Sequence, residues 1–255
     1  MKERENSMPD SQKHWVRLPL ENAHNVRELG GYPVKGGGQT AYHRFLRADD
    51  LSTLTDNDIA FLMAYGVSMV IDLRSDDEAQ KAPDRFDGAA GIQYRRIPFL
   101  GRDLADIMQA SQADAALGLG ALYASMLENK AVVKKLFEAI EQAPEGCIMF
   151  HCTAGKDRTG VLAMLLMSLA GADRQDCITN YEQSYINLTR KAEFTQMSEA
   201  ALLAKYQILM YSLPETIANC YDYMTQTYGS AEAYLKECGL SEHQLEHIKR
   251  RLLEA

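Results

Sequence analysis

The residues with the clearest potential for chemistry are Cys152 and Arg158, which are separated by five positions. The segment 151–160 reads His-Cys-Thr-Ala-Gly-Lys-Asp-Arg-Thr-Gly and stands between an apolar, strand-like run and an apolar, helix-like stretch. A loop in that setting can curl around a tetrahedral anion, because consecutive backbone N–H groups form a nest and the following helix presents its positive amino-terminal end. The pattern therefore predicts a phosphate-binding loop that carries a thiol.

The side chains of this loop fit the parts of a phosphoryl-transfer reaction. The planar guanidinium of Arg158 can hold two phosphate oxygens, and the same positive field favours the thiolate of Cys152. That thiolate could attack phosphorus and form a phosphocysteine intermediate, with Asp157 as the general acid that later activates water. Asp72, expected at the carboxyl end of a buried strand, is a rival for the acid. Such a mechanism needs no metal and no cofactor.

The other loop residues are predicted to bind or shape the site. A glycine at 155 lets the backbone approach the anion closely. Lys156 adds a fixed positive charge, Thr159 is expected to hydrogen-bond the cysteine sulfur, and His151 is expected to orient the loop from behind. The predicted phosphate-binding set is Thr153, Ala154, Gly155, Lys156 and Thr159.

Residues elsewhere are predicted to support this loop. Arg74 and Glu78 are expected to form a structural ion pair close to Asp72. Asn25 and Arg27 are interpreted as scaffold for the loop, with no direct part in the chemistry.

Three other interpretations of these motifs are weaker. Cys152 could be a buried structural thiol, but a nucleophile, an arginine, a glycine, a strand and a helix all agree with one site geometry. The Gly-Lys pair lacks the Ser or Thr, and the earlier glycine, of a nucleotide-binding loop. A zinc-protease order, His-Gln-Leu-Glu-His at 243–247, lies too close to the carboxyl terminus for a distant third ligand and is expected on an exposed helix.

Composition narrows the class of protein and its partners. Of 255 residues, 46% are hydrophobic and 24% charged, which is typical of a globular protein and excludes disorder as the main state. The net charge of −8 disfavours binding to nucleic acid. Five widely spread cysteines predict no disulfide framework, and no segment reads as a membrane span or secretory signal. A cytoplasmic location is expected, and export by another route stays open.

Periodicity predicts an α/β fold with a central, mainly parallel sheet flanked by helices and a helical carboxyl-terminal third. Extended segments are expected at 32–34 and 40–46, and buried strands at 67–73, 93–99 and 147–150. Helices are expected after Thr55, at 131–142, at 160–172 and through most of 173–255, the last beginning at Ser241.

The sequence resembles a family of bacterial tyrosine and lipid phosphatases. The loop matches the family pattern His-Cys-x-x-Gly-Lys-Asp-Arg-Thr, and the resemblance extends to Asn25-Val-Arg-Glu-Leu-Gly-Gly31, Arg47-Ala-Asp49 and Ile71-Asp-Leu-Arg74 with Glu78. Position 28 holds Glu where Asp is commoner in the family. The resemblance covers nearly the whole chain.

The resemblance implies a single phosphatase domain over 14–255 with a cysteine-phosphatase-like fold. The charges of both signs and the lack of an apolar run at 1–13 predict a disordered tail before it. It implies action on phosphotyrosine, on phosphoserine or phosphothreonine in some members, and on phosphoinositides, with inorganic phosphate able to occupy the loop. By this resemblance Cys152 is the nucleophile, Arg158 the phosphate ligand, Asp157 the acid and Lys156 a helper toward additional phosphates. A helical lid within 185–213 is a further implication, although an ordinary packed helical pair fits the same segment.

Two other functions remain as alternatives. The nest and Arg158 could serve a phosphate-binding module that does not turn over, although such a module needs neither the thiol nor Asp157. A thiol oxidoreductase such as an arsenate reductase would need a resolving cysteine nearby, and the sequence places none beside Cys152.

Overall fold

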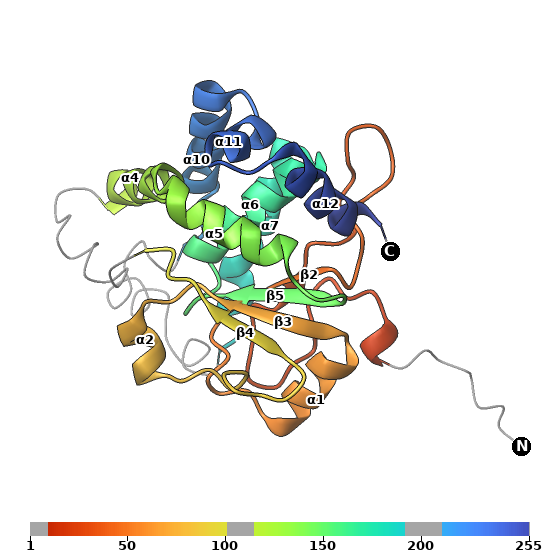
Figure 1. Cartoon of the computed structure of the whole chain (residues 1–255). Coiled ribbons are helices and arrows are strands. Elements are labelled where there is room, and N and C mark those ends of the chain that lie inside the picture. The colour runs from red at the N-terminus through yellow and green to blue at the C-terminus, as the bar shows by residue number, and fades with distance from the viewer. Residues whose placement is uncertain (1–9, 101–114, 192–210, 255) are drawn as a thin grey trace, which may run out of the picture.

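The computed structural model describes residues 10–100, 115–191 and 211–254, and Figure 1 shows their arrangement. A five-stranded sheet forms the centre, in the order β1-β2-β5-β3-β4. β2, β5, β3 and β4 are parallel, and only β1 runs antiparallel, beside β2. The predicted α/β class with a mainly parallel sheet and a helical carboxyl-terminal third is confirmed. The strands are β1 (Arg27–Glu28), β2 (Phe45–Ala48), β3 (Val67–Asp72), β4 (Gln93–Arg96) and β5 (Cys147–His151).

Helices cover both faces of this sheet. In Figure 1 a few α-helices lie below the sheet, and a larger layer of α-helices lies above it. On the lower side are α1 (Asp56–Ala64) and α2 (Asp76–Lys81). The upper layer consists of α4 (Ala115–Glu128), α5 (Lys130–Glu141), α6 (Asp157–Ala170), α7 (Arg174–Leu188), α10 (Pro214–Tyr228), α11 (Ala231–Glu237) and α12 (Glu242–Leu253). Among the described residues, no helix combines the length and the apolar character needed to cross a membrane.

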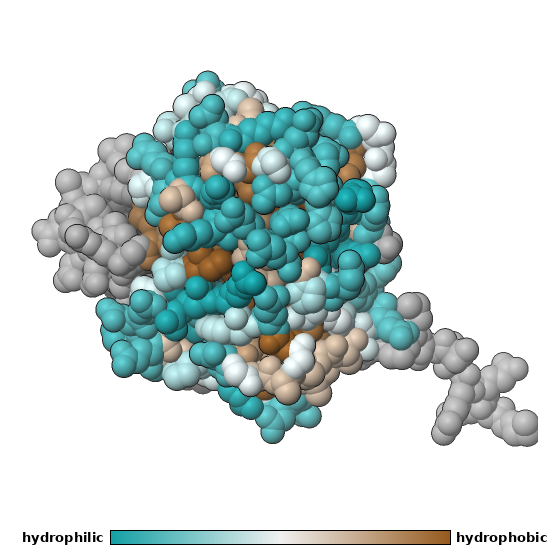
Figure 2. Space-filling model, in the orientation of Figure 1, coloured by the Kyte–Doolittle hydropathy of each residue, from teal (hydrophilic) through white to brown (hydrophobic). Residues whose placement is uncertain are grey.

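The strands bury alternate residues in two separate cores. In β5, Ile148 and Phe150 pack under the upper helices, whereas Cys147 and Met149 pack toward α1. This division follows from the two-residue repeat of a strand. It explains why β5 is apolar throughout, as expected of a strand buried on both faces. Outside these cores, the face shown in Figure 2 is mostly hydrophilic and carries only small apolar patches.

Local signals set several helix ends where the sequence predicts them. Thr55 caps α1 and Ser241 caps α12, each in a reciprocal capping box with the residue three positions on. α6 ends at Gly171, which takes a left-handed conformation with φ of 94°. The His-Gln-Leu-Glu-His segment lies on α12, where His247 Nδ1 is 3.3 Å from Glu141.

Some elements differ from expectation. Segments 32–34 and 40–46 form no extended hairpin: one isolated bridge joins Pro33 to Gln39, and regular strand begins only at Phe45. The three intervening glycines all have positive φ, which curls the chain there. Two helices were not predicted: α2, whose six residues are rich in charge and show no apolar period, and α4.

Two predicted segments fall partly outside the described residues. Of the predicted tail, residues 1–9 are not described, and Asp10–Gln12 forms a short 3-10 helix. Of the predicted lid, residues 192–210 are not described, while Tyr185 belongs to the last turn of α7.

Candidate active site

The thiol-bearing loop lies at the carboxyl ends of the parallel strands. His151 ends β5, Asp157 begins α6, and the loop joins them. In register with His151 stand Ala48, the last residue of β2, and Asp72, the last residue of β3. Open α/β sheets gather functional groups at this edge. The sequence of strand, loop and helix is therefore the one predicted for an anion site.

Scaffold donors hold the four consecutive backbone carbonyls of residues 153–156. The Asp50 amide donates to the first carbonyl (3.1 Å). Asn25 Nδ2 donates to the second (2.9 Å) and the third (3.2 Å). Arg47 Nη2 donates to the third (2.7 Å) and the fourth (3.3 Å). All four carbonyls therefore point toward the scaffold.

This arrangement fixes the direction of the loop amides. In a trans peptide the N–H points opposite to the C=O of the same unit. Because the scaffold binds the carbonyls of 153–156, the N–H groups of 154–157 point to the other side, toward the inside of the loop. The amino-terminal end of α6 opens toward the same side, and its first residue is Asp157. Four convergent amides at a helix start make an anion-binding nest.

Arg158 lies buried at this site and is held by a carboxylate. Its Nη1 donates to Glu78 Oε2 (2.5 Å) and its Nη2 to Glu78 Oε1 (2.8 Å). Thr153 Oγ1 also donates to Glu78 Oε1 (2.7 Å). Burial opposes the charged guanidinium, but Glu78 and the nearby Cys152 raise the pKa of Arg158. Among the described residues its Nε has no partner, which leaves one buried donor for an anion.

The ion-pair partner of Glu78 differs from the predicted one. The expected ion pair between Arg74 and Glu78 is wrong, because Glu78 binds Arg158 and Arg74 binds Asp72 and Asp50. Burial raises the pKa of Glu78, but the bonds from Arg158 and Thr153 outweigh it and lower the pKa to about 2.

Asp157 is buried next to Lys156, and both are turned toward the upper helices. The Tyr123 hydroxyl donates to Asp157 Oδ1 (2.6 Å), and Lys156 Nζ lies 3.4 Å from the same oxygen. Lys156 Nζ also donates to the Tyr211 carbonyl (3.1 Å). The loop's second positive charge thus lies directly beside the predicted acid.

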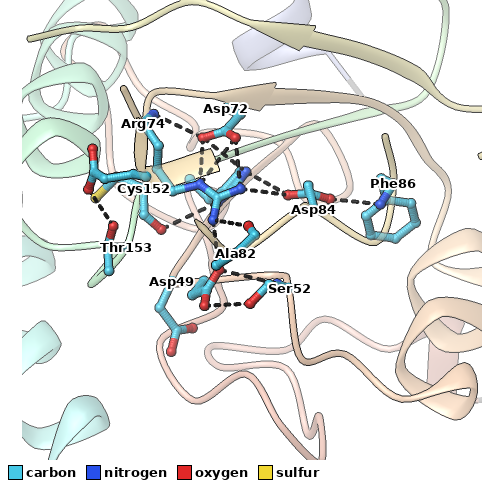
Figure 3. A network of polar contacts seen from close by, with 12 residues as sticks. Asp49, Ser52, Asp72, Arg74, Ala82, Asp84, Phe86, Cys152 and Thr153 are labelled. Atoms are coloured by element: carbon cyan, nitrogen blue, oxygen red, sulfur yellow. Dashed lines mark hydrogen bonds and ion pairs between the residues drawn. The ribbon is translucent and has the colours of Figure 1, made fainter. Parts of the chain in front are cut away.

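Asp72 is part of a buried ionic cluster beneath the loop. Its carboxylate accepts from Arg74 Nη2 (2.9 Å) and from the Tyr94 hydroxyl (2.8 Å), and it lies 3.5 Å from His151 Nε2. Asp84 Oδ2 lies 2.9 Å from the same imidazole nitrogen. Figure 3 shows the Arg74 guanidinium between the carboxylates of Asp72 and Asp84, with Cys152 beside this cluster. Asp72 is therefore engaged in support of the loop.

The charges of this cluster compensate one another. Burial disfavours the ionised form of Asp72, but His151 and Arg74 lower its pKa. Burial likewise opposes protonation of His151, but Asp84 and Asp72 raise its pKa. The ligand atoms of His151 and the two carboxylates lie within 4.8 Å of one another, a spacing that could suit a metal ion. The Arg74 guanidinium already supplies the cation at this place, because it lies 2.9 Å from Asp72 and 3.9 Å from Asp84.

Two buried arginines brace the other side of the loop. Arg27 donates to the Asn180 carbonyl (2.6 Å) and to the Asn25 side chain (2.5 Å). Arg47 donates to Asn180 Oδ1 (2.6 Å) as well as to the loop. Burial lowers the pKa of Arg47 to about 10, even though the nearby Cys152 opposes that change. Asn25 and Arg27 thus lie in the scaffold position that the sequence predicts for them.

The remaining loop residues are placed as follows. Cys152 is buried at the base of the loop, and all five cysteines are free thiols. Gly155 has φ of 64°, and a Cβ there would lie 2.4 Å from the Ala48 carbonyl oxygen. The predicted bond from Thr159 to the cysteine sulfur is not formed: within the described part of the chain, Thr159 Oγ1 is buried without a partner.

Several residues that support the loop were not predicted from the sequence. Asp84, Tyr123, Asn180 and Tyr181 lie in segments without a recognisable motif, and only the fold brings them to the loop. Arg47 stands in a segment that carries the family resemblance, which was the one available signal for its role.

Comparisons with known proteins identify the family. A sequence model of the tyrosine phosphatase family matches residues 18–254. The chain is 33% identical to a tyrosine-protein phosphatase of Nostoc commune over 228 residues, covering 83% of this chain and 74% of that protein. It is 28% identical to a putative tyrosine-protein phosphatase of Cupriavidus necator, covering 86% and 83%. It is 26% identical to the triple specificity protein phosphatase PtpB of Mycobacterium tuberculosis, covering 89% and 99%.

The chain belongs to the tyrosine phosphatase family. The predicted resemblance to the bacterial tyrosine phosphatases is confirmed, and so is the prediction of a protein-tyrosine-phosphatase-like enzyme.

Proposed function

We propose that the protein is a cysteine-dependent phosphomonoester hydrolase that acts on phosphotyrosine proteins through a phosphocysteine intermediate. The observation that carries this proposal is the orientation of the loop: scaffold donors bind its four carbonyls, so its amides converge above a thiol and beside a buried arginine. Four amides and a guanidinium complement the three equatorial oxygens of a phosphoryl group in transfer.

The proposed reaction has two steps. In the first, the Cys152 thiolate attacks phosphorus, an S–P bond forms, the ester P–O bond breaks, and Asp157 gives its proton to the leaving oxygen. In the second, Asp157 takes a proton from water, the water oxygen attacks phosphorus, and the S–P bond breaks to release inorganic phosphate and the thiolate. Arg158, held in its plane by Glu78, binds phosphate oxygens in both steps.

The substrate range is a further part of the proposal. The relative named as a triple specificity phosphatase supports action on phosphoserine and phosphothreonine besides phosphotyrosine. Lys156, a residue of the nest with a positively charged side chain, supports acceptance of a more highly phosphorylated ligand such as a phosphoinositide. Five free thiols support a reducing compartment, the cytoplasm, as the place of action.

The test is phosphate release from an aryl phosphate at mildly acidic pH, with a chelator present, by the native chain and by Cys152→Ser. We expect chelator-resistant activity that disappears in the variant, because serine at this place is not ionised. Isothermal titration should still detect phosphate binding by Cys152→Ser, whereas Arg158→Ala should lose both turnover and binding. A native chain that binds phosphate without releasing it from the ester would indicate the phosphate-binding module instead.

A further inference from the structure

Three helices place a short chain of hydroxyl groups against Asp157. Tyr123 comes from α4 and Tyr181 from α7, and both are buried, with exposed fractions of 0% and 1%. The two hydroxyl oxygens lie 2.8 Å apart, and the Tyr123 hydroxyl lies 2.6 Å from Asp157 Oδ1. Neither tyrosine belongs to the loop or to its carbonyl scaffold.

The direction of the hydrogen bonds follows from counting protons. A tyrosine hydroxyl has one proton, and that of Tyr123 goes to the Asp157 carboxylate. The bond between the tyrosines must therefore be donated by Tyr181. Hydrogen bonds that run in one direction strengthen one another in a low-dielectric interior. The chain thus ends in a strong donor to one oxygen of the predicted acid.

The geometry also locks the donor in place. The rings of Tyr123 and Tyr181 meet edge to face at 83°, with their centroids 6.2 Å apart. Burial, together with Asp157, raises the pKa of Tyr123 well above its ordinary value, so its hydroxyl keeps its proton. Lys156 Nζ also faces Oδ1, at 3.4 Å. Among the described residues, the side chains that contact the acid therefore gather on Oδ1.

We infer that Tyr123 is a positioning residue that fixes the Asp157 side chain by binding Oδ1, so that Oδ2 exchanges the proton with the leaving group, and that Tyr181 reinforces this contact. The inference rests on the proposed function, because it needs Asp157 as the acid. Tyr123 touches neither substrate nor phosphorus in this scheme and acts only through Asp157.

The experiment compares two aryl substrates. Phenyl phosphate has a poor leaving group that needs the acid, whereas 4-nitrophenyl phosphate has a good one that needs it little. We compare kcat/KM, which reports the first step and not the hydrolysis of the intermediate that both substrates share. For Tyr123→Phe we expect kcat/KM to fall about ten-fold on phenyl phosphate and less than about two-fold on 4-nitrophenyl phosphate. Tyr181→Phe should lower kcat/KM on phenyl phosphate by a smaller factor.

A double-mutant cycle with Asp157→Asn separates positioning from packing. In the Asp157→Asn background, Tyr123→Phe should not lower kcat/KM on phenyl phosphate any further, because no proton donor is left for Tyr123 to position. The matched control is Tyr234→Phe, which also removes a buried tyrosine bond to α4, in this case to the Leu127 carbonyl (2.6 Å). It should leave the ratio of kcat/KM values on the two substrates unchanged.

The outcomes distinguish the inference from the function beneath it. If Asp157→Asn slows the hydrolysis of phenyl phosphate but Tyr123→Phe does not, Asp157 is still the acid and the positioning role of Tyr123 is refuted. Equal losses on both substrates, or an undiminished loss in the Asp157→Asn background, would refute it as well. If Asp157→Asn itself shows no dependence on the leaving group, the assignment of the acid fails and the positioning role fails with it. Thermal unfolding of each variant identifies any loss that comes from misfolding.

Discussion

Replacement of Gly155 by alanine should disable the loop while leaving the fold intact. A Cβ at this position would lie 2.4 Å from the Ala48 carbonyl oxygen, 2.6 Å from its carbon and 2.8 Å from the Asp49 nitrogen. All three are backbone atoms at the end of β2 and of the residue after it, so a turn of a side chain cannot relieve the contact. The loop would have to move by at least about 0.6 Å to reach the shortest tolerable separation of 3.0 Å, and by about 1 Å to reach ordinary contact.

A displacement of that size has a predictable effect on the reaction. A misplacement of about 1 Å can cost roughly 100-fold in rate, because the nucleophile and the oxyanion donors leave their aligned positions. We therefore expect kcat of Gly155→Ala on an aryl phosphate to fall about 100-fold. The left-handed backbone conformation, with φ of 64°, adds a cost of about 1–2 kcal/mol to folding.

The control for backbone strain is Gly37→Ala. Gly37 also has a positive φ, 98°, but a Cβ there would meet nothing within 4 Å. This variant should show a similar loss in the free energy of unfolding, measured by urea titration, and an unchanged kcat. If Gly155→Ala keeps activity within about three-fold of the native chain, the close approach to Ala48 does not determine the shape of the loop, and the reasoning is refuted.

Three further predictions concern charge. Glu78→Gln should raise KM on an aryl phosphate about ten-fold, because Arg158 loses the carboxylate that fixes its plane; unchanged steady-state kinetics would contradict this role. Burial raises the pKa of Glu28 from 4.5 to about 7. Between these two pH values the folded state keeps a proton that the unfolded state has lost, so the free energy of unfolding should fall by about 3 kcal/mol from pH 4.5 to 7. Urea titrations at several pH values in that range should show the fall in the native chain and not in Glu28→Gln. An equal change of the free energy of unfolding with pH in both proteins would refute the prediction. Asn180→Ala should lower the free energy of unfolding by about 3 kcal/mol, because Arg47 loses a buried acceptor, and a loss below about 1 kcal/mol would show that water replaces it.

The parts of the site that are close in sequence were predictable, and the parts that the fold assembles were not. The loop from Cys152 to Arg158 carries its own signal, because nucleophile, glycine and arginine stand at fixed spacing between a strand and a helix. Apolar runs likewise predicted β3, β5 and α6. The partner of Glu78 was predicted incorrectly, because Arg158 lies 80 positions away and only the pairing of β3 with β5 brings the two together. Tyr123 gave no signal, since a tyrosine in an apolar helix most often packs in a core.

The bracing of the loop carbonyls also has a consequence for how the chain acquires activity. Asn25 and Arg47 bind a loop that lies 129 and 108 positions later, and Arg47 is itself bound by Asn180. Contacts between such distant positions form slowly, because a long stretch of chain must be closed before they are made. During synthesis, α7 must also leave the ribosome before the guanidinium has its acceptor. Catalytic competence should therefore appear in the last phase of refolding, after most of the native helix content has formed, which makes turnover a reporter of the final folding step.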